Sequence, residues 1–264
     1  MRLVIDAGNS TIAAALADDG HLLATDRRPI AEATDPERLA TALSAALGAQ
    51  VLETSAVEAV VLASVVPAAT AAVTAFAAHR GLDLIVAGPD TIPIAVRLRH
   101  PAEVGPDRLV NAFAAARLHG VPAVVVDVGT ATTWECVDAA GAFVGGAIAP
   151  GLRLGLDALA ERTALLPRVS VDLPASAIGR DTVSAIRSGT VLGHAELVTG
   201  LTRRIVTELA ERCGVAPEAV HTVLTGGLSA TEWSEAPDGF ETVDPDLTLR
   251  GLALLPVVSP AIAR

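Results

Sequence analysis

The sequence of 264 residues contains no lysine, and all 19 of its basic residues are arginines. Three classes of enzyme depend on a lysine. P-loop proteins place one on the nucleotide phosphates, protein kinases carry one on their third strand, and pyridoxal enzymes form a Schiff base with one. The absence of lysine therefore excludes these three classes.

Aromatic residues and cysteines are also scarce. Tyrosine is absent, and the chain has four phenylalanines, two tryptophans and two cysteines. Half of the residues are apolar, mostly Ala, Val and Leu, which predicts a well-buried globular protein with room for two modest lobes. Cys136 and Cys213 show no CxxC or metal-ligand spacing, which indicates reduced core thiols in a cytoplasmic protein.

The chain is acidic: its 30 acidic residues outnumber the 19 arginines and give a formal net charge of −11. This balance argues against nucleic acid or an anionic membrane as the main partner. No signal peptide is expected, because strand-like "RLVI" follows Met1 without a basic and an apolar region. The uncharged run Ala59–Ala78 is 20 residues long, but Pro67 divides it into a predicted buried strand, Val60–Val66, and a helix that ends at His79.

β-branched apolar segments alternate with alanine-rich segments, and this alternation predicts an α/β fold. The stretch "DPERLATALSAALG" predicts a helix that Asp35 caps, with Pro36 in the first position. One further expected helix starts at Pro106, with Gly120 past its end, and another runs from Glu196 to Gly214. The expected strands are Leu3–Ile5, Ile12–Leu16, Val60–Val66, Leu84–Val86, Val124–Val128, Thr133–Val137, Phe143–Ala147 and Thr222–Thr225.

One construction occurs twice, as "RLVIDAGNST" from Arg2 and as "VVVDVGTATTW" from Val124. In each, a strand leads into an aspartate, a glycine and small hydroxyl residues, and the two aspartates, Asp6 and Asp127, are 127 − 6 = 121 residues apart. The repeat predicts two similar lobes, residues 1–118 and 119–264, with a cleft between them. The boundary is expected at the "HGVP" turn.

Such a turn has the chemistry of a phosphate site. Glycine lets the backbone approach a phosphate closely, N–H groups and hydroxyls donate to its oxygens, and the carboxylate can hold a bridging cation. A third small-residue turn, "VLTGGLSA" from Val223, could be an ordinary turn if it stood alone. Following the other two, it is suited to an adenosine.

Together these motifs resemble the actin/sugar-kinase/Hsp70 ATPase superfamily and, within it, the type III pantothenate kinases. The resemblance implies two ribonuclease-H-like lobes. The motifs that carry it are "DAGNS", "ASVVP", "HPAEVGPDRLVNA", "VVDVGTATTWECVD", "GAFVGGAIAPGLRL", "ERTALLPRV", "IGRDTVSAIRSG", "LTGGLSA" and "VDPDLTLRGL".

The resemblance implies transfer of the γ-phosphoryl group of ATP to pantothenate, the first step towards coenzyme A. It also implies dependence on Mg²⁺ and on a monovalent cation, K⁺ or NH₄⁺, and a homodimer in the cytoplasm. It assigns ATP binding to Asp6, Ala7, Gly8, Asn9, Ser10, Thr11, Ile12, Ala13, Thr130, Gly226 and Gly227. It assigns the substrate to Leu98, Gly105, Pro106, Asp107, Arg108 and Thr182, with Asp107 as the catalytic base, and the monovalent cation to Asp127, with Glu135 as a further candidate.

The physical reading of Asp107 agrees with that role. It lies in the first turn of a predicted helix, where the helix dipole and Arg108 stabilise a negative charge. A carboxylate there can accept the proton of an attacking hydroxyl, and Arg108 is suited to the carboxylate of pantothenate. By spacing alone, a solvated helix start is the better interpretation of Asp107 and Arg108, and only the surrounding motif reverses it.

Four positions depart from the family pattern. Ser10 stands in place of a threonine, Ala13 removes a basic residue found in some relatives, Leu98 replaces a tyrosine, and Glu135 replaces an aspartate. These departures leave two alternatives open: a non-catalytic regulatory relative, or a kinase for another small alcohol.

Overall fold

The computed structural model describes residues 1–48 and 57–256 and divides the chain into two compact units. The first comprises Met1–Ile94, His100–Ala114 and the segment from Thr248, and the second comprises Ala95–Arg99 and Ala115–Leu247. This division differs from the predicted boundary at residue 118, because the chain passes between the units within a continuous helix, α4 (Pro106–Leu118). The predicted lobes also include residues 49–56 and 257–264, which lie outside the described residues.

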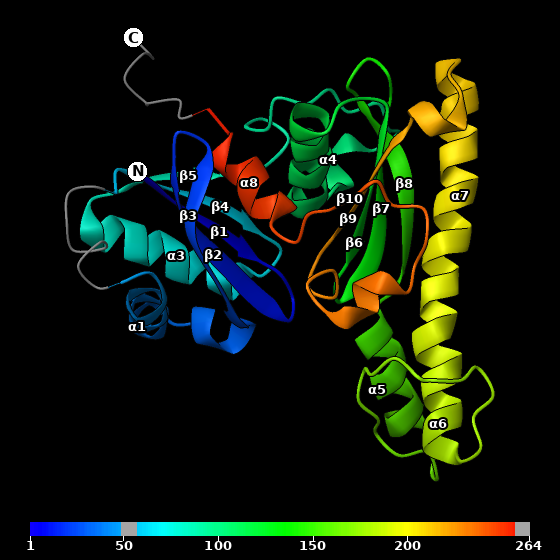
Figure 1. Cartoon of the computed structure of the whole chain (residues 1–264). Helices are drawn as coiled ribbons and strands as arrows, with labels where there is room; N and C mark the ends of the chain where they lie inside the picture. The colour runs from blue at the N-terminus through cyan, green and yellow to red at the C-terminus, as the bar shows by residue number, and fades with distance from the viewer. Residues whose placement is uncertain (49–56, 257–264) are drawn as a thin grey trace. The chain divides into compact units, whose positions relative to one another are not determined.

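The first unit is built on a five-stranded sheet with the strand order β3-β2-β1-β4-β5 (Figure 1). The pairs β1–β2 and β2–β3 are antiparallel, and β1–β4 and β4–β5 are parallel. The strands are β1 Arg2–Ala7, β2 Thr11–Asp18, β3 His21–Pro29, β4 Ala59–Ser64 and β5 Asp83–Val86.

Helices α1 (Pro36–Leu47) and α3 (Pro67–Arg80) cover one face of this sheet. As predicted, Asp35 caps α1, and its Oδ1 accepts the backbone N–H groups of Glu37 and Arg38 at 3.0 Å each. The stripe of Leu39, Leu43 and Leu47 packs into the core with alternate residues of β1. The unit also contains the short helix α8 (Leu247–Ala253) from its second residue onward.

The second unit has a sheet with the order β10-β9-β6-β7-β8. Its strands are β6 Ala123–Val128, β7 Ala131–Val137, β8 Phe143–Pro150, β9 His221–Thr225 and β10 Thr242–Val243. One face packs against a long helix, α7 (Gly193–Cys213), which runs beside the green sheet in Figure 1. Helices α5 (Leu152–Arg162) and α6 (Thr182–Arg187) precede it, and a π-helical turn, Ser188–Leu192, joins α6 to α7.

The two sheets have the same topology, which confirms the predicted duplicated α/β architecture. Read from β8, the second sheet repeats the first: an antiparallel meander (β6–β7–β8) followed by two parallel strands (β9 and β10). β1 (Arg2–Ala7) and β6 (Ala123–Val128) are both six residues long and begin 123 − 2 = 121 residues apart. This is the offset between the two aspartates.

All eight predicted strands are present, with small differences at their ends. The strand predicted as Val60–Val66 ends at Ser64, because the Ser64 hydroxyl receives the backbone N–H of Val66 in a turn before α3. Predictions missed β3 and β10, as well as α5, α6 and α8.

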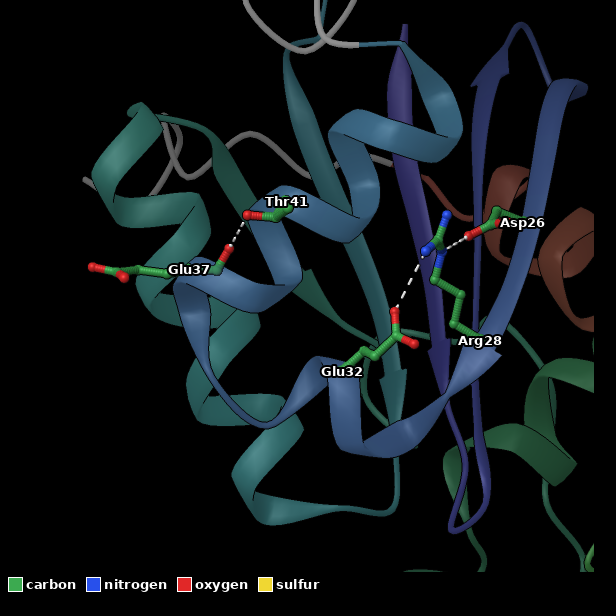
Figure 2. Close-up of polar contacts among 5 residues, drawn as sticks. All are labelled: Asp26, Arg28, Glu32, Glu37 and Thr41. Carbon is green, nitrogen blue, oxygen red and sulfur yellow. Dashed lines mark hydrogen bonds and ion pairs between the residues drawn. The ribbon is translucent and has the colours of Figure 1, made fainter.

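β3 was missed because polar and apolar residues are mixed on both sides of the strand, without alternation between them. Arg28 of β3 pairs with Asp26 at 2.6 Å and with Glu32 of the following 3-10 turn at 3.4 Å (Figure 2). The hydrogen bond to Asp26 is the first cause of the raised pKa of Arg28. These contacts favour a solvated edge strand, which carries no apolar alternation for a sequence pattern to detect. None of the helices in the described part of the chain combines the length and hydropathy that a membrane crossing requires.

Candidate functional site

In the first unit, the Asp6 side chain lies on the face of the sheet away from α1 and α3. Side chains alternate along a strand, and Leu3, Ile5 and Ala7 enter the core on the α1–α3 face. The Gly8–Ser10 turn after β1 is closed by the Gly8 N–H, which donates to the Thr11 carbonyl at 2.9 Å. This is the turn that the sequence assigned to phosphate.

The start of α4 lies beside the ends of two parallel strands of the same unit. The Val65 N–H donates to the Ala7 carbonyl at 3.1 Å, so that the chain after β4 runs next to the end of β1. A Cβ atom at Gly105 would lie 3.9 Å from Cγ1 of Val65 and only 2.5 Å from Oδ1 of Asp107. Gly105 therefore leaves the space that the half-buried Asp107 carboxylate occupies. That carboxylate also accepts the Arg108 backbone N–H at 2.9 Å.

The structure thus gathers the Asp6 turn, the end of β4 and the Gly105–Arg108 segment at one edge of the first sheet. The carboxyl ends of parallel strands are the usual place for ligands in α/β proteins. A helix N-terminus at that edge adds N–H groups and a positive partial charge. These features suit an anionic ligand.

In the second unit, Asp127 and Gly226 are in direct contact. A Cβ atom at Gly226 would lie 2.3 Å from Oδ1 of Asp127 and 2.7 Å from the Val128 backbone nitrogen. Gly226 also has φ of +92°, a conformation that favours glycine. The absence of a side chain at Gly226 therefore lets the Asp127 carboxylate lie over the start of the "TGG" turn.

The Gly129–Thr130 turn is enclosed by a segment that the sequence analysis did not assign. The Gly151 N–H donates to the Thr130 carbonyl at 3.1 Å. A Cβ at Gly151 would lie 2.3 Å from the carbonyl oxygens of both Gly129 and Thr130. Gly151 therefore fixes the turn, and the "APG" in the quoted "GAFVGGAIAPGLRL" motif is the sequence signal that could have identified it.

Four oxygen-bearing side chains share one face of the second sheet. Asp127 pairs with Thr225 across β6–β9 and with Thr133 across β6–β7, and Val125 pairs with Glu135. Because Val125 and Asp127 are two residues apart, all these side chains lie on one face, opposite the face that packs on α7. Glu135 and Thr225 are both 0 % exposed. The Thr225 hydroxyl, which the sequence analysis missed, has no hydrogen-bond partner among the described residues.

Leu98 and Thr182, the two predicted substrate contacts outside the Gly105–Arg108 segment, lie in the second unit. Leu98 is half-buried, and its Cδ2 lies 3.6 Å from the place of a Cβ at Gly145 of β8. Thr182 is the exposed first residue of α6, which begins with a capping box between Asp181 and Ser184. The Ser184 backbone N–H is the first cause of the lowered pKa of Asp181.

The described residues contain no group of three or more His, Cys, Asp or Glu side chains that could hold a metal ion. The carboxylates instead stand singly or in diagonal positions on the sheet, as Asp127 and Glu135 do. Such positions suit a cation that receives its remaining ligands from a bound phosphate or from water.

Comparison with known proteins assigns the chain to a family. The family model described as type III pantothenate kinase matches residues 2–204. The type III pantothenate kinase of Thermomicrobium roseum is 41 % identical over 254 residues, covering 96 % of this chain and 95 % of the relative. That of Rubrobacter xylanophilus is 38 % identical over 267 residues and covers 100 % of both chains.

Among solved structures, a Baf family protein from Campylobacter jejuni has the same fold, with a TM-score of 0.55 at 18 % identity. The match covers 95 % of this chain and 94 % of that protein. The relatives and the family model agree over almost the whole length, and the chain belongs to the type III pantothenate kinase family.

Proposed function

We propose that this protein transfers the γ-phosphoryl group of ATP to the terminal hydroxyl of pantothenate and so forms 4′-phosphopantothenate. The observation that carries the proposal is the position of Asp107, at the start of α4 and beside the carboxyl ends of β1 and β4, in a member of this family. Phosphoryl transfer needs a base that accepts the proton of the attacking hydroxyl.

Asp107 is suited to be that base. The Arg108 N–H donates to its Oδ1 at 2.9 Å and so restricts rotation of the carboxylate. The second oxygen, Oδ2, can then accept the hydroxyl proton. Arg108 follows directly and can pair with the carboxylate of pantothenate, while Leu98 and Thr182 are proposed as further substrate contacts.

For the nucleotide, we assign the phosphates to the Asp6–Ala13 turn and to Thr130, and the adenosine to Gly226 and Gly227. Each turn offers backbone N–H groups near a carboxylate, Asp6 in one unit and Asp127 in the other. Mg²⁺, when bound, would neutralise charge on the phosphates. The oxygen ligands that it prefers would come from an aspartate together with the phosphates themselves.

The monovalent cation is assigned to Asp127, with Glu135 on the same face of the sheet. The residues fit such an ion because carboxylate and hydroxyl oxygens are the ligands of hard cations, and the buried hydroxyl of Thr225 lies on a strand neighbouring Asp127. A buried polar atom without a partner is often explained by an ion or a water molecule. We further propose a homodimer in the cytoplasm; Ile148 of β8 and Leu154 of α5, 66 % and 50 % exposed, offer apolar surface for a second copy.

The test is to incubate the purified protein with ATP, Mg²⁺ and pantothenate, with and without K⁺, and to detect 4′-phosphopantothenate by mass spectrometry. We expect K⁺-dependent product from the wild type and none from Asp107→Asn. The matched control is Glu103→Gln, which removes an exposed negative charge four residues away and should leave turnover unchanged.

Product from Asp107→Asn at the wild-type rate would remove Asp107 as the base. Folded wild-type protein that binds ATP or pantothenate but forms no product with any cation would instead indicate a non-catalytic relative.

A further inference from the structure

A buried histidine in the second unit is not used by the proposed reaction. His194 lies in the first turn of α7 and is only 8 % exposed. Its Nε2 lies 3.0 Å from Oγ1 of Thr132, a β7 residue that is 0 % exposed. Its ring also faces the Trp233 ring, with centroids 5.5 Å apart and planes at 45°. Three buried side chains from three segments therefore meet at His194.

Trp233 connects this cluster to the break between α6 and α7. Its indole Nε1 donates to the Val191 carbonyl at 3.2 Å, and Val191 belongs to the π-helical turn Ser188–Leu192. π-helical turns inside helices are frequent at functional sites. His194 is the second residue after this turn, so its position depends on the geometry of the break.

Both partners of His194 lead directly to the turns assigned to ATP. Thr132 is two residues after Thr130 and pairs with Val128 at the end of β6. Val128 in turn accepts the Leu228 N–H at 3.2 Å, which ties the "TGG" turn to the same strand end. Trp233 lies in the 3-10 turn Glu232–Glu235 that follows, and the Thr231 N–H donates to the Leu228 carbonyl at 3.1 Å.

We propose that His194 is a positioning residue for ATP, which holds the Gly129–Thr130 turn and the Gly226–Gly227 turn in register through Thr132 and Trp233. The ring does not touch the nucleotide. It fills the space between β7 and the Trp233 segment, so that neither turn can shift without breaking a buried contact. The inference rests on the proposed function, because it takes these two turns as the ATP site.

The cluster works with an uncharged imidazole. Burial lowers the pKa of His194 from its ordinary value of 6.5, and no charged side chain contributes to the shift. Glu196 on α7 and Glu232 and Glu235 beside Trp233 are exposed, and Glu135 of β7 lies on the opposite face of the sheet. On α6, Arg187 pairs with Asp172 at 2.9 Å. A proton on His194 would therefore be a buried charge without a partner.

Two substitutions separate the contacts of His194. His194→Gln keeps a polar group near Thr132 but cannot titrate, whereas His194→Phe keeps a ring against Trp233 but loses the hydrogen bond. Thr132→Val removes the same bond from the other side with little change in volume. His21→Gln, at an exposed histidine of β3 in the first unit, is the control.

ATP affinity is measured by titration calorimetry, which needs no turnover, at a temperature where each variant is fully folded by circular dichroism. We expect His194→Phe and Thr132→Val to weaken ATP binding about 3- to 10-fold, or about 0.7–1.4 kcal/mol. These losses correspond to one buried hydrogen bond, which contributes about 1 kcal/mol. For His194→Gln, which keeps a polar group near Thr132, and for the control, the ATP affinity should change less than about 2-fold.

A second readout is tryptophan fluorescence in a Trp134→Phe background, measured from about pH 5 to about pH 8, the range in which histidine titrates. Because the chain has no tyrosine and only two tryptophans, the emission then reports Trp233 alone. We expect a titration with a midpoint below 6.5, the ordinary value for histidine, that His194→Gln abolishes and His21→Gln does not.

A purely structural His194 would lower the melting temperature of the variants but leave the ATP affinity of the folded protein unchanged, and this result would overturn the inference. The proposed function can fail separately. Suppose that the wild-type protein binds ATP but forms no phosphopantothenate, while the His194→Phe and Thr132→Val variants bind ATP more weakly. This result would support the positioning role and contradict the kinase reaction.

Discussion

The two glycines of the "TGG" turn are adjacent, yet the structure predicts very different responses to substitution by alanine. At Gly226 a Cβ would lie 2.3 Å from Oδ1 of Asp127, 2.7 Å from the Val128 nitrogen and 2.9 Å from its carbonyl carbon. At Gly227 nothing lies within 4 Å of the same atom. Gly226 has φ of +92°, and Gly227 is exposed and does not need a positive φ.

The cost of Gly226→Ala has two parts. Placing an L-residue in the left-handed region costs about 1–2 kcal/mol. Moving the Asp127 carboxylate away costs a further 0.5–1.5 kcal/mol, roughly the energy of a displaced rotamer. The Val128 backbone cannot move as easily, because it lies within β6. The free energy of unfolding should therefore fall by about 1.5–3.5 kcal/mol, against at most about 0.5 kcal/mol for Gly227→Ala.

The assay is urea unfolding of both variants followed by circular dichroism, together with calorimetric titration of ATP and of K⁺. Gly226→Ala should weaken the K⁺ response as well as stability, because the displaced group is the proposed cation ligand. Equal losses of stability in the two variants would contradict this prediction, because the expected difference comes entirely from the positive φ of Gly226 and the contacts of its Cβ position.

Four further outcomes follow from other contacts. Asp35→Ala removes the acceptor of two backbone N–H groups at 3.0 Å and should destabilise the first unit by about 1 kcal/mol in urea unfolding. Gly200→Ala within α7, where nothing lies within 4 Å, should raise stability by about 0.5–1 kcal/mol in the same assay. Gly251→Ala in α8 would bring a Cβ to 2.7 Å from Val110 Cγ1 and should cost about 1–3 kcal/mol. Because the folded pKa of His194 lies below 6.5, the unfolded state binds more protons below that pH, and the melting temperature should fall there more steeply in the wild type than in His194→Gln.

Predictions from the sequence succeeded where the signal is local. The helix α1 has its cap, its proline and its leucine stripe within 14 residues, and each of these features is present as predicted. The strand–Asp–Gly repeat succeeded for the same reason, since both copies are short and self-contained. Each strand was predicted from its own residues, and β1 and β6 begin at the same 121-residue offset as the two aspartates.

The failures occurred where tertiary contacts decide the conformation. β3 has no apolar alternation, and its strand conformation depends on pairing with β2 and on the ion pairs of Arg28. α6 has only six residues and would not be stable alone; its capping box and the continuation into the π-helical turn maintain it. No sequence pattern could predict the π-helical turn, because the Trp233 indole that bonds its Val191 carbonyl is 42 residues away.

The same distinction explains why the sequence predicts the two glycines of the "TGG" turn as site residues but misses the side chains that support them. Gly226 was evident from its own motif. Thr225 and His194 acquire a role only through register: Thr225 by pairing with Asp127 across β6–β9, and His194 by reaching Thr132 from a helix 62 residues further along the chain. Both contacts join residues too far apart in the sequence for a short motif to include both partners. A lone buried histidine and a threonine before two glycines are structurally ordinary until the strands are aligned. Residues that support a site from a neighbouring strand or helix are therefore those most readily missed in a sequence, and a search for them should begin at buried polar atoms next to the motif.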